Sequence, residues 1–408
     1  MKIVDVVRPG SMYQIIGPVA TLKRILSNRS FFLEKGLDIS IFNRGHFYQT
    51  LQQLSENNVA SSKVEIKHRI KEYFDRKAKH SYLLSVVLVV YVFRTIKQVV
   101  DSYLSYKRNP DVVVLHAEPE AYWIIRHFKK KNIKTKTVVF FHNDCIPFKM
   151  YLLYYPKLDS SSYWSKMMKR YEYIINNADK LCFICEAGMK NINRLYPQTI
   201  DKSFLIVNGI TDLTSQELKD VSNIKQNRCD NTINLCCVGS VSVRKAQRKV
   251  IEALGMLSIE KRKKFHLAIL GAGPDLPYCK EFVEKNNLCE IVSFEGAVLN
   301  TDVYKHLAQA DIFVLLSENE GLPISIIEAM RAGLAIISTN VSGIPELVSN
   351  DNGLLIRPDA EQLAEILFNS EKYNWKQMGE NSRQLYERKF TFCLLYTSDA
   401  ADDLTRVD

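Results

Sequence analysis

No hydrophobic run in the sequence is long enough to form a membrane-crossing helix by itself. The longest, residues 82–93 (YLLSVVLVVYVF), would be about 18 Å long as a helix, against a hydrocarbon core of roughly 30 Å. No signal-peptide pattern opens the chain, because the short apolar run at 3–7 ends at Arg8-Pro9-Gly10. We therefore expect a cytoplasmic protein. Residues 82–93 are expected to be a buried element or, with the basic stretch 67–80 before them, a shallow docking patch at the inner face of the cell membrane.

Disulfide and metal-binding patterns are also missing. The nine cysteines form an odd, scattered set, which suits reduced cytosolic thiols better than a disulfide framework. Cys182 and Cys185 have CxxC spacing, but they lie in the strand-like run LCFIC, where residues three apart point to opposite faces. No other Cys/His group has zinc-ligand spacing, so we expect no metal and no bound cofactor.

The signatures of two large functional classes are absent as well. There is no zinc finger, RNA-recognition signature or basic heptad region, which argues against nucleic acid as the partner. Neither half has a G-x-G-x-x-G turn after its first strand, which argues against a hydride-transferring dinucleotide enzyme. The run GAGP at 271–274 matches that fingerprint only in its first three residues.

Length and charge indicate two domains of different character. A chain of 408 residues is too long for one compact core, and its 46% hydrophobic and 25% charged residues are typical of globular proteins. Residues 1–210 hold 33 Lys+Arg against 17 Asp+Glu, whereas the remainder holds 22 against 28. The basic first half is expected to face an anionic partner, membrane headgroups rather than nucleic acid, or else to be a solvated basic surface.

Short apolar runs alternate with helical patterns along the whole chain, which predicts an α/β protein with parallel sheets. Each half has enough such runs for its own doubly wound sheet. Residues 208–232 between them are polar and rich in Asn and Asp, as a linker is. We expect a first domain over 1–208, a linker over 209–232 and a second domain over 233–392. Open sheets bind ligands beyond the carboxyl ends of their strands, so the site is expected between the domains.

The most informative segment is SENEGLPISIIEAMRAG, residues 317–333, which follows the strand-like run DIFVLL. Pro323 suits the first helical position and Gly333 the C-terminal cap, which predicts a helix over about 322–332. Its free N-terminal amides are suited to a phosphate. Glu320 and Glu328 can reach the same pocket, where carboxylates accept hydrogen bonds from sugar hydroxyls. A nucleotide sugar carries both kinds of group; the alternative is two solvated surface acids.

This segment resembles the signature of family 4 of the retaining glycosyltransferases. The resemblance rests on Glu320-x7-Glu328 within EGLPISIIEAMRAGLAIISTNVSGIPELV (320–348) and on VGSVSVRKAQ (238–247), ILGAGP (269–274) and FEGAV (294–298). It is strong from about residue 230 to 370 and thinner before that. It implies the GT-B fold, with two Rossmann-like domains that face an interdomain cleft.

The resemblance assigns roles in the second domain residue by residue. Glu328 is expected to bind the donor ribose and Glu320 the transferred sugar. Backbone amides would hold the donor sugar and phosphate, and backbone near Val298 would select the base. In this family a Gly-Arg pair and a later Lys neutralise the diphosphate of the donor. Gly239 and Lys245 match this pattern, but Ser240 stands in place of the Arg. Arg244 or Arg248 could supply the missing positive charge. The backbone amides belong to Gly321, Leu322, Pro323 (which has no amide hydrogen) and Ile324.

In the first domain the resemblance is weaker. Gly17, in IIGPVATLKRIL (15–26), lies near the position of the family's glycine-rich loop, as a donor-binding residue. His142 ends the strand TVVFFH, where the family has an active-site histidine; the alternative is a histidine that merely ends a strand. His116 ends DVVVLHA and has no assigned role. Residues 393–408 (CLLYTSDAADDLTRVD) lack the apolar period of a docking helix and are expected to be a non-native tail.

The implied activity is a metal-independent, retaining sugar transfer from a nucleotide-diphosphate sugar to a saccharide or lipid-linked acceptor, in surface polysaccharide or glycoconjugate synthesis. His142 and Glu320 are the expected catalytic residues. Two alternatives stay open. The chain could be a non-catalytic sugar-nucleotide-binding partner of another transferase, which Ser240 suggests, or a nucleotide-sugar epimerase of the same fold.

Overall fold

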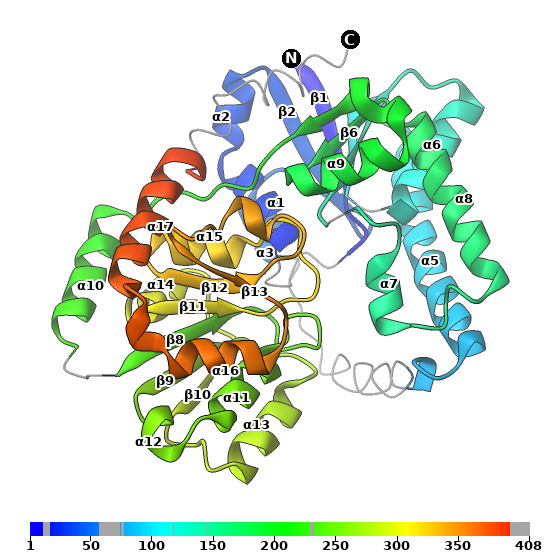
Figure 1. The fold of residues 1–408 in the computed structure, drawn as a ribbon. Helices are drawn as coiled ribbons and strands as arrows, with labels where there is room; N and C mark the ends of the chain where they lie inside the picture. Colours follow the sequence, from blue (N-terminus) through cyan, green and yellow to red (C-terminus); the bar gives the residue numbers. More distant parts are fainter. Residues whose placement is uncertain are drawn as a thin grey trace. The chain divides into compact units, whose positions relative to one another are not determined.

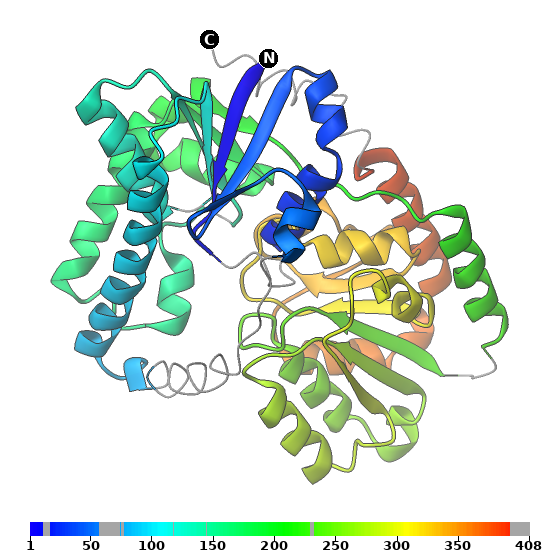
Figure 2. The same cartoon turned by 180° about the vertical axis from the view of Figure 1, so that it is seen from behind.

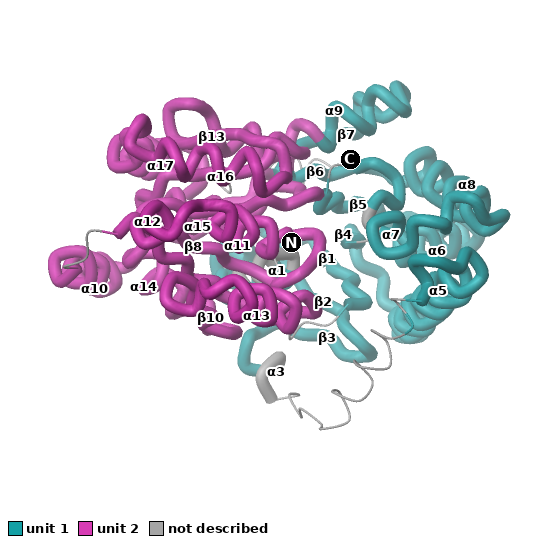
Figure 3. The backbone as a smooth tube through the Cα atoms, turned by 60° about the horizontal axis from the view of Figure 1, so that its bottom comes forward, with its two compact units in different colours: residues 1–184, 188–206, 403–408 teal, residues 185–187, 207–402 magenta. Residues whose placement is uncertain are grey.

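The computed structural model describes residues 1–10, 17–56, 74, 77–116, 118–143, 145–228 and 232–391. These residues form two compact units (Figure 3). Of the described residues, unit 1 contains those within 1–184 and 188–206, and unit 2 contains 185–187 and those within 207–391. Each unit is an open α/β sheet covered by helices (Figure 1), as the alternating pattern predicts. The tail at 393–408 lies outside the described residues.

Unit 1 is built on a seven-stranded sheet with the order β3-β2-β1-β4-β5-β6-β7. β3 pairs antiparallel with β2, and the other described pairs are parallel. The strand order reverses between β1 and β4. The strands are β1 (Lys2–Val7), β2 (Leu37–Asn43), β3 (His46–Tyr48), β4 (Val112–Leu115), β5 (Lys136–Phe141), β6 (Lys180–Phe183) and β7 (Ser203–Leu205).

Helices cover both faces of this sheet, which is why β4 and β5 are nearly continuous apolar runs. The described helices of this half of the chain are α1 (Gly17–Ser27), α2 (Arg29–Glu34), α3 (Leu51–Glu56), α5 (Tyr82–Ser105), α6 (Glu118–Lys131), α7 (Lys149–Tyr154), α8 (Ser162–Asn177), α9 (Glu186–Leu195) and the 3-10 turn η1 (Pro197–Lys202).

Unit 2 has a six-stranded, parallel sheet with the order β10-β9-β8-β11-β12-β13. Here the order reverses between β8 and β11. The strands are β8 (Ile233–Val238), β9 (Phe265–Leu270), β10 (Val292–Gly296), β11 (Ile312–Leu315), β12 (Ala335–Thr339) and β13 (Gly353–Ile356). The helices are α10 (Ser215–Gln226), α11 (Gln247–Met256), α12 (Ile259–Arg262), α13 (Leu276–Lys285), α14 (Val303–Ala308), α15 (Ile324–Arg331), η2 (Ile344–Glu346), α16 (Ala360–Phe368), η3 (Ser370–Lys372) and α17 (Trp375–Lys389).

The segment expected as a linker, 209–232, contains a helix. α10 begins at a capping box in which Thr214 and Glu217 satisfy each other's backbone amides. The segment is also tied to unit 2, because Arg383 of α17 forms a bidentate ion pair with Asp212 and Tyr304 donates a hydrogen bond to Asp220. The polar composition of the segment reflects a solvated helix, since α10 has no buried residue.

The apolar run at 82–93 is half of a longer helix. α5 spans 24 residues, and by length and composition it is the one described helix that could cross a membrane, although 22% of its most apolar window is buried in the protein. The expectation of an element of about 18 Å is therefore wrong, because at about 1.5 Å per residue α5 is roughly 36 Å long. The helix continues past Phe93 through Arg94, Lys97 and Gln98, which are good helix formers.

Candidate functional site

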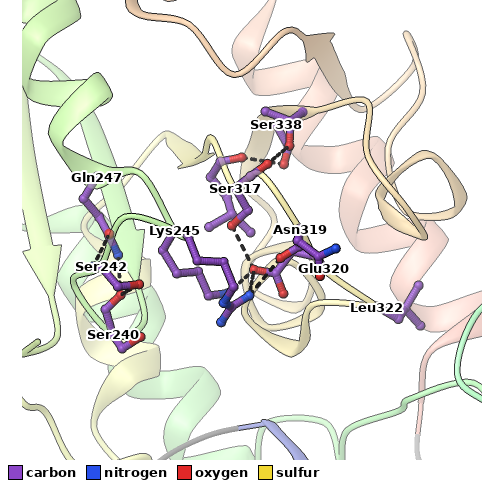
Figure 4. Close-up of polar contacts among 12 residues, drawn as sticks. Ser240, Ser242, Lys245, Gln247, Ser317, Asn319, Glu320, Leu322 and Ser338 are labelled. Atoms are coloured by element: carbon purple, nitrogen blue, oxygen red, sulfur yellow. Dashed lines mark hydrogen bonds and ion pairs between the residues drawn. The ribbon is translucent and has the colours of Figure 1, made fainter. Parts of the chain in front are cut away.

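A buried carboxylate with two cationic partners lies in unit 2, in the loop between β11 and α15. Glu320 Oε1 is 2.7 Å from Arg244 Nη1 and 2.7 Å from Lys245 Nζ. Ser317 Oγ donates a third hydrogen bond to the same oxygen at 2.8 Å. Figure 4 shows Glu320 between Ser317 and Lys245. Arg244 Nη1 also donates to the backbone carbonyl of Asn319 at 2.9 Å, so it joins the two loops.

The charges in this cluster depend on one another. Burial alone would raise the pKa of Glu320, but Lys245 and Arg244 outweigh it, so that the pKa of Glu320 is lowered. Burial lowers the pKa of Lys245, and Glu320 and Glu328 oppose that shift. Glu328, half-buried in α15, is therefore close enough to act on the same ammonium group. The structure thus brings together both predicted acids and both predicted cations.

The topology of the sheet explains why these groups meet. Lys245 follows β8 and Glu320 follows β11, and these two strands are neighbours. They are also the strands between which the order reverses. At such a switch point two loops diverge to opposite faces and leave a crevice at the carboxyl ends of the strands. This position favours a ligand site independently of any resemblance.

Close backbone packing holds the loop after β8. Gly239 has φ +139° and donates its amide hydrogen to the Leu270 carbonyl at 2.9 Å. Gly271, after β9, has φ +145°, and a Cβ atom there would lie 1.9 Å from the Gly239 oxygen. A side chain at Gly271 cannot fit without moving the loop that carries Lys245.

The structure distinguishes Arg244 from Arg248, the two residues that could supply the positive charge of the family arginine that Ser240 replaces. Ser240 is exposed, and its backbone carbonyl accepts a hydrogen bond from Gln247. Arg244 reaches Glu320, whereas the Arg248 guanidinium lies 6.0 Å from the centre of the Tyr278 ring. Arg244 is therefore the cation that joins Lys245.

The helix after the acidic loop differs slightly from the prediction. α15 begins at Ile324, and Pro323 is its N-cap residue with ψ 116°, so the expected helical position of Pro323 is wrong by one residue. Gly333 has φ +74° just beyond the last turn, as a C-terminal glycine requires. The Gly321 and Leu322 carbonyls accept hydrogen bonds from the Gly343 amide and the Asn208 side chain, so that their peptide planes are held.

Two predicted residues have no described contact with this cluster. Val298 lies two residues beyond β10 and is half-buried. Gly17 is the first residue of α1 in unit 1. Their predicted roles rest on the resemblance. Within the described ranges, no group of three or more His, Cys, Asp or Glu side chains is placed to hold a metal ion.

Unit 1 has a second polar centre, a pair of stacked histidines at the ends of β4 and β5. His116 Nδ1 lies 2.7 Å from His142 Nε2, and the His116 ring also stacks on Phe140. Burial, reinforced by the positive charge of Arg8, lowers the pKa of His142 to about 3. Burial, His142 and Arg8 lower the pKa of His116 well below its usual value. Both rings are neutral at physiological pH, so one donates its N–H to the other.

Arg8 is the residue of this centre that the sequence analysis missed. It follows β1, which neighbours β4 at the point where the strand order of unit 1 reverses. Its backbone carbonyl accepts a hydrogen bond from Asn43 at 2.6 Å. In the sequence, Arg8 stands in the break Arg8-Pro9-Gly10 after the first apolar run, and its place after the first strand was the available signal.

Comparisons with known proteins identify the class of this fold. The Anabaena protein Alr3699/HepE, solved in complex with UDP, matches 99% of this chain and 100% of its own with a TM-score of 0.67 and 15% sequence identity. Together with the two Rossmann-like sheets, this likeness confirms the predicted GT-B fold.

The family comparison covers the second half of the chain. Residues 232–369 match the family described as Glycosyl transferases group 1. The putative colanic acid biosynthesis glycosyltransferase WcaL of Escherichia coli K12 is 33% identical over 143 residues, which are 33% of this chain and 35% of that protein. One component of the human phosphatidylinositol N-acetylglucosaminyltransferase is 29% identical over 168 residues, 36% of this chain and 35% of that protein. The matched region spans about a third of each relative, and it supports the predicted resemblance to glycosyltransferases.

Proposed function

We propose that this protein is a retaining, metal-independent glycosyltransferase that moves a sugar from a nucleotide-diphosphate sugar to a saccharide or lipid-linked acceptor. The observation that carries the proposal is the cluster of Lys245, Arg244 and Glu320 at the switch point of unit 2. Two cations and a helix N-terminus suit a diphosphate, while Glu320 and Glu328 suit the hydroxyls of a sugar and a ribose.

In this proposal the donor diphosphate binds Lys245 and Arg244 beside the first turn of α15. The phosphate oxygens then share these cations with Glu320, and the Glu320 carboxylate accepts a hydrogen bond from the transferred sugar. Glu328 binds the ribose hydroxyls. The fixed positive charges stabilise the diphosphate as it departs, the role that a metal ion has in other transferases. Gly239 keeps the loop backbone close to the phosphates, with the peptides at Gly321, Leu322, Pro323 and Ile324 on the other side.

The proposed transfer step uses this arrangement. The bond between the anomeric carbon and the phosphate oxygen breaks, and the acceptor oxygen bonds to the anomeric carbon on the same face. The acceptor proton passes to the departing phosphate, so that no protein base is needed. His142, neutral and hydrogen-bonded to His116, orients the sugar by a hydrogen bond.

The acceptor class is inferred from charge and from the relatives. The first 210 residues carry 33 basic and 17 acidic residues, which suits an anionic or membrane-borne acceptor. The names of the two relatives cited above include colanic acid biosynthesis and phosphatidylinositol. We assign this chain to surface polysaccharide or glycoconjugate synthesis at the cytoplasmic face of a membrane.

A panel of UDP, GDP and ADP sugars, scored by thermal stabilisation, tests the donor site. At least one nucleotide sugar is expected to raise the Tm of the wild-type chain, because a ligand that binds the folded state stabilises it. Lys245→Ala should abolish that shift. Lys249→Ala is the matched control, since Lys249 pairs with Glu318 at 2.9 Å and not with Glu320. No shift with any donor would overturn the proposal.

Product analysis separates the two alternatives. A transferase releases the nucleoside diphosphate and an epimerase returns an isomerised nucleotide sugar. A non-catalytic partner binds the donor and releases neither product. Arg244 favours the transferase, since it provides the charge that Ser240 lacks.

A further inference from the structure

The first turns of α5 carry an exposed apolar surface in unit 1. Tyr82, Leu83, Val87 and Tyr91 are between 53% and 66% exposed. Leu83, Val87 and Tyr91 are spaced by four residues and so lie one above another on the same face of the helix. Figure 2 shows α5 along the outside of unit 1. We call these four residues the α5 patch.

The rest of α5 is anchored in the protein. Val89, Phe93, Val100 and Tyr103 are buried in the core of unit 1, and Tyr103 donates a hydrogen bond to the buried Asp5 at 3.0 Å. Beyond Tyr91, the exposed face becomes polar with Arg94, Gln98 and Asp101. Insertion across a bilayer would pull the buried face out of this core. The apolar patch covers only about three turns, roughly 15 Å, which suits a surface contact.

Basic residues outnumber acidic ones in the sequence on both sides of the α5 patch. Residues 67–80, directly before it, hold six Lys or Arg and two Asp or Glu. Of these, Lys77 and Lys79 are exposed at the start of α5, and Arg94 is exposed one turn beyond Tyr91. The sequence has no acidic residue between Asp75 and Asp101. An apolar strip with tyrosines and flanking cations is complementary to an anionic lipid surface, because tyrosine is favoured at the headgroup level and basic side chains are drawn to anionic lipids.

The α5 patch also lies toward the end of the sheet at which the strands have their carboxyl ends. α5 is joined to β4 by the six residues 106–111, so the helix runs back along the sheet and its first turns lie toward the carboxyl ends of the strands. His116 and His142 follow β4 and β5 at that end. The α5 patch therefore lies toward the same end of the sheet of unit 1 as the histidine pair.

We propose that the α5 patch docks unit 1 on the surface of an anionic membrane. The four apolar side chains enter the interface between headgroups and acyl chains, and Lys77, Lys79 and Arg94 contact anionic headgroups. The reason for docking rests on the proposed function, since docking brings a lipid-linked acceptor to unit 1 without α5 crossing the bilayer.

Vesicle flotation of the full chain tests the docking surface. Wild-type protein should float with vesicles of phosphatidylcholine and phosphatidylglycerol, and less with phosphatidylcholine alone. The triple variant L83S/V87S/Y91S should reduce the vesicle-bound to free ratio by roughly tenfold or more, because three apolar contacts are lost. K77E/K79E should reduce binding only to the anionic vesicles. The matched control is L218S/M256S/I259S, which removes side chains of unit 2 that are between 45% and 59% exposed and should float like the wild type.

Several outcomes would overturn the docking surface. Equal flotation of the wild type and the triple variant would do so, as would binding that ignores lipid charge. A wild-type dimer that the triple variant converts to monomer would instead make a second copy of the chain the occupant. Resistance of the bound protein to alkaline carbonate would indicate a spanning helix. The donor-induced Tm shift is measured in parallel. Its absence would contradict the proposed function, whereas the flotation result would still decide whether the α5 patch binds membranes.

Discussion

His116 Nδ1 and His142 Nε2 lie 2.7 Å apart in unit 1, on neighbouring strands and with stacked rings. Two protonated imidazoles cannot share this bond, because each would need the other as an acceptor. The pair therefore requires at least one neutral ring, and burial and the charge of Arg8 favour the neutral form of both. Protonation of both rings breaks the contact.

This pairing predicts a loss of stability in mild acid. The folded-state pKa of His142 is about 3, below its unfolded value near 6.5, so the unfolded chain binds more protons as the pH falls. The stabilisation is complete above pH 6.5 and decreases toward pH 3. At pH 5.5 the loss from His142 is about 1.4 kcal/mol relative to pH 7.5. Urea unfolding at both pH values measures it, and His116→Phe should reduce the pH-dependent difference. An unchanged difference in this variant would contradict the pairing.

Substitution of the two acids should separate binding from turnover. Glu328→Ala is expected to raise the donor KM by roughly 10- to 100-fold, because a charged hydrogen bond to ribose is lost. Glu320→Gln should mainly lower kcat, since this carboxylate contacts the sugar that moves. Steady-state kinetics on both variants give the answer. Glu318→Gln, which removes the charge of the neighbouring pair with Lys249, is the control. Equal changes in KM and kcat in both variants would count against the assigned roles.

Arg244 should carry the charge that Ser240 lacks. Arg244→Ala is expected to lower kcat/KM by roughly 10- to 100-fold, in line with a lost charge-assisted hydrogen bond. Arg248→Ala, whose guanidinium lies over Tyr278, should have a much smaller effect. Adding Ser240→Arg to Arg244→Ala should restore part of the activity, because position 240 is exposed and can accept the larger side chain. A double variant no better than Arg244→Ala, or an equal loss in Arg248→Ala, would show that the compensation is absent.

Two glycines test the backbone packing beneath the site. Gly271→Ala places a Cβ atom 1.9 Å from the Gly239 oxygen, and the free energy of unfolding should fall by several kcal/mol, with loss of donor binding. Gly36→Ala is the matched control, since Gly36 has φ +78° and nothing within 4 Å of the added Cβ. It should cost about 1 kcal/mol and leave donor binding intact. Chemical denaturation and the donor Tm shift distinguish the two; similar losses in both variants would mean that φ alone matters.

The chain end gives a simpler test. Deletion of residues 393–408 should leave the Tm and the transfer rate unchanged, because the sequence there has no apolar period that could dock on either unit. A clear loss of either quantity would make the tail a working part of the enzyme.

The sequence predicted those parts of the fold that depend on local patterns. Apolar runs located the strands, and the proline and glycine around 323–333 located α15 to within one or two residues. The sequence could not predict contacts between distant residues. No local pattern indicates that Arg244 rather than Arg248 contacts Glu320, or that His116 contacts His142. The length of α5 was missed because polar residues after Phe93 end the apolar run without ending the helix. α10 was missed because it has no buried residue to give an apolar period, and it is held by its cap and by contacts from distant residues.

The cluster in unit 2 contains two acids, Glu320 and Glu328, and two cations, Lys245 and Arg244. Its formal charges cancel, so the cluster offers a free anion little net attraction. Inorganic phosphate or chloride would compete with carboxylates already bound to the cations and would gain no hydroxyl contacts in return. A nucleotide sugar satisfies both signs of charge at once. A cluster whose charges already cancel therefore favours a ligand that carries both an anionic group and hydroxyls over a small inorganic anion.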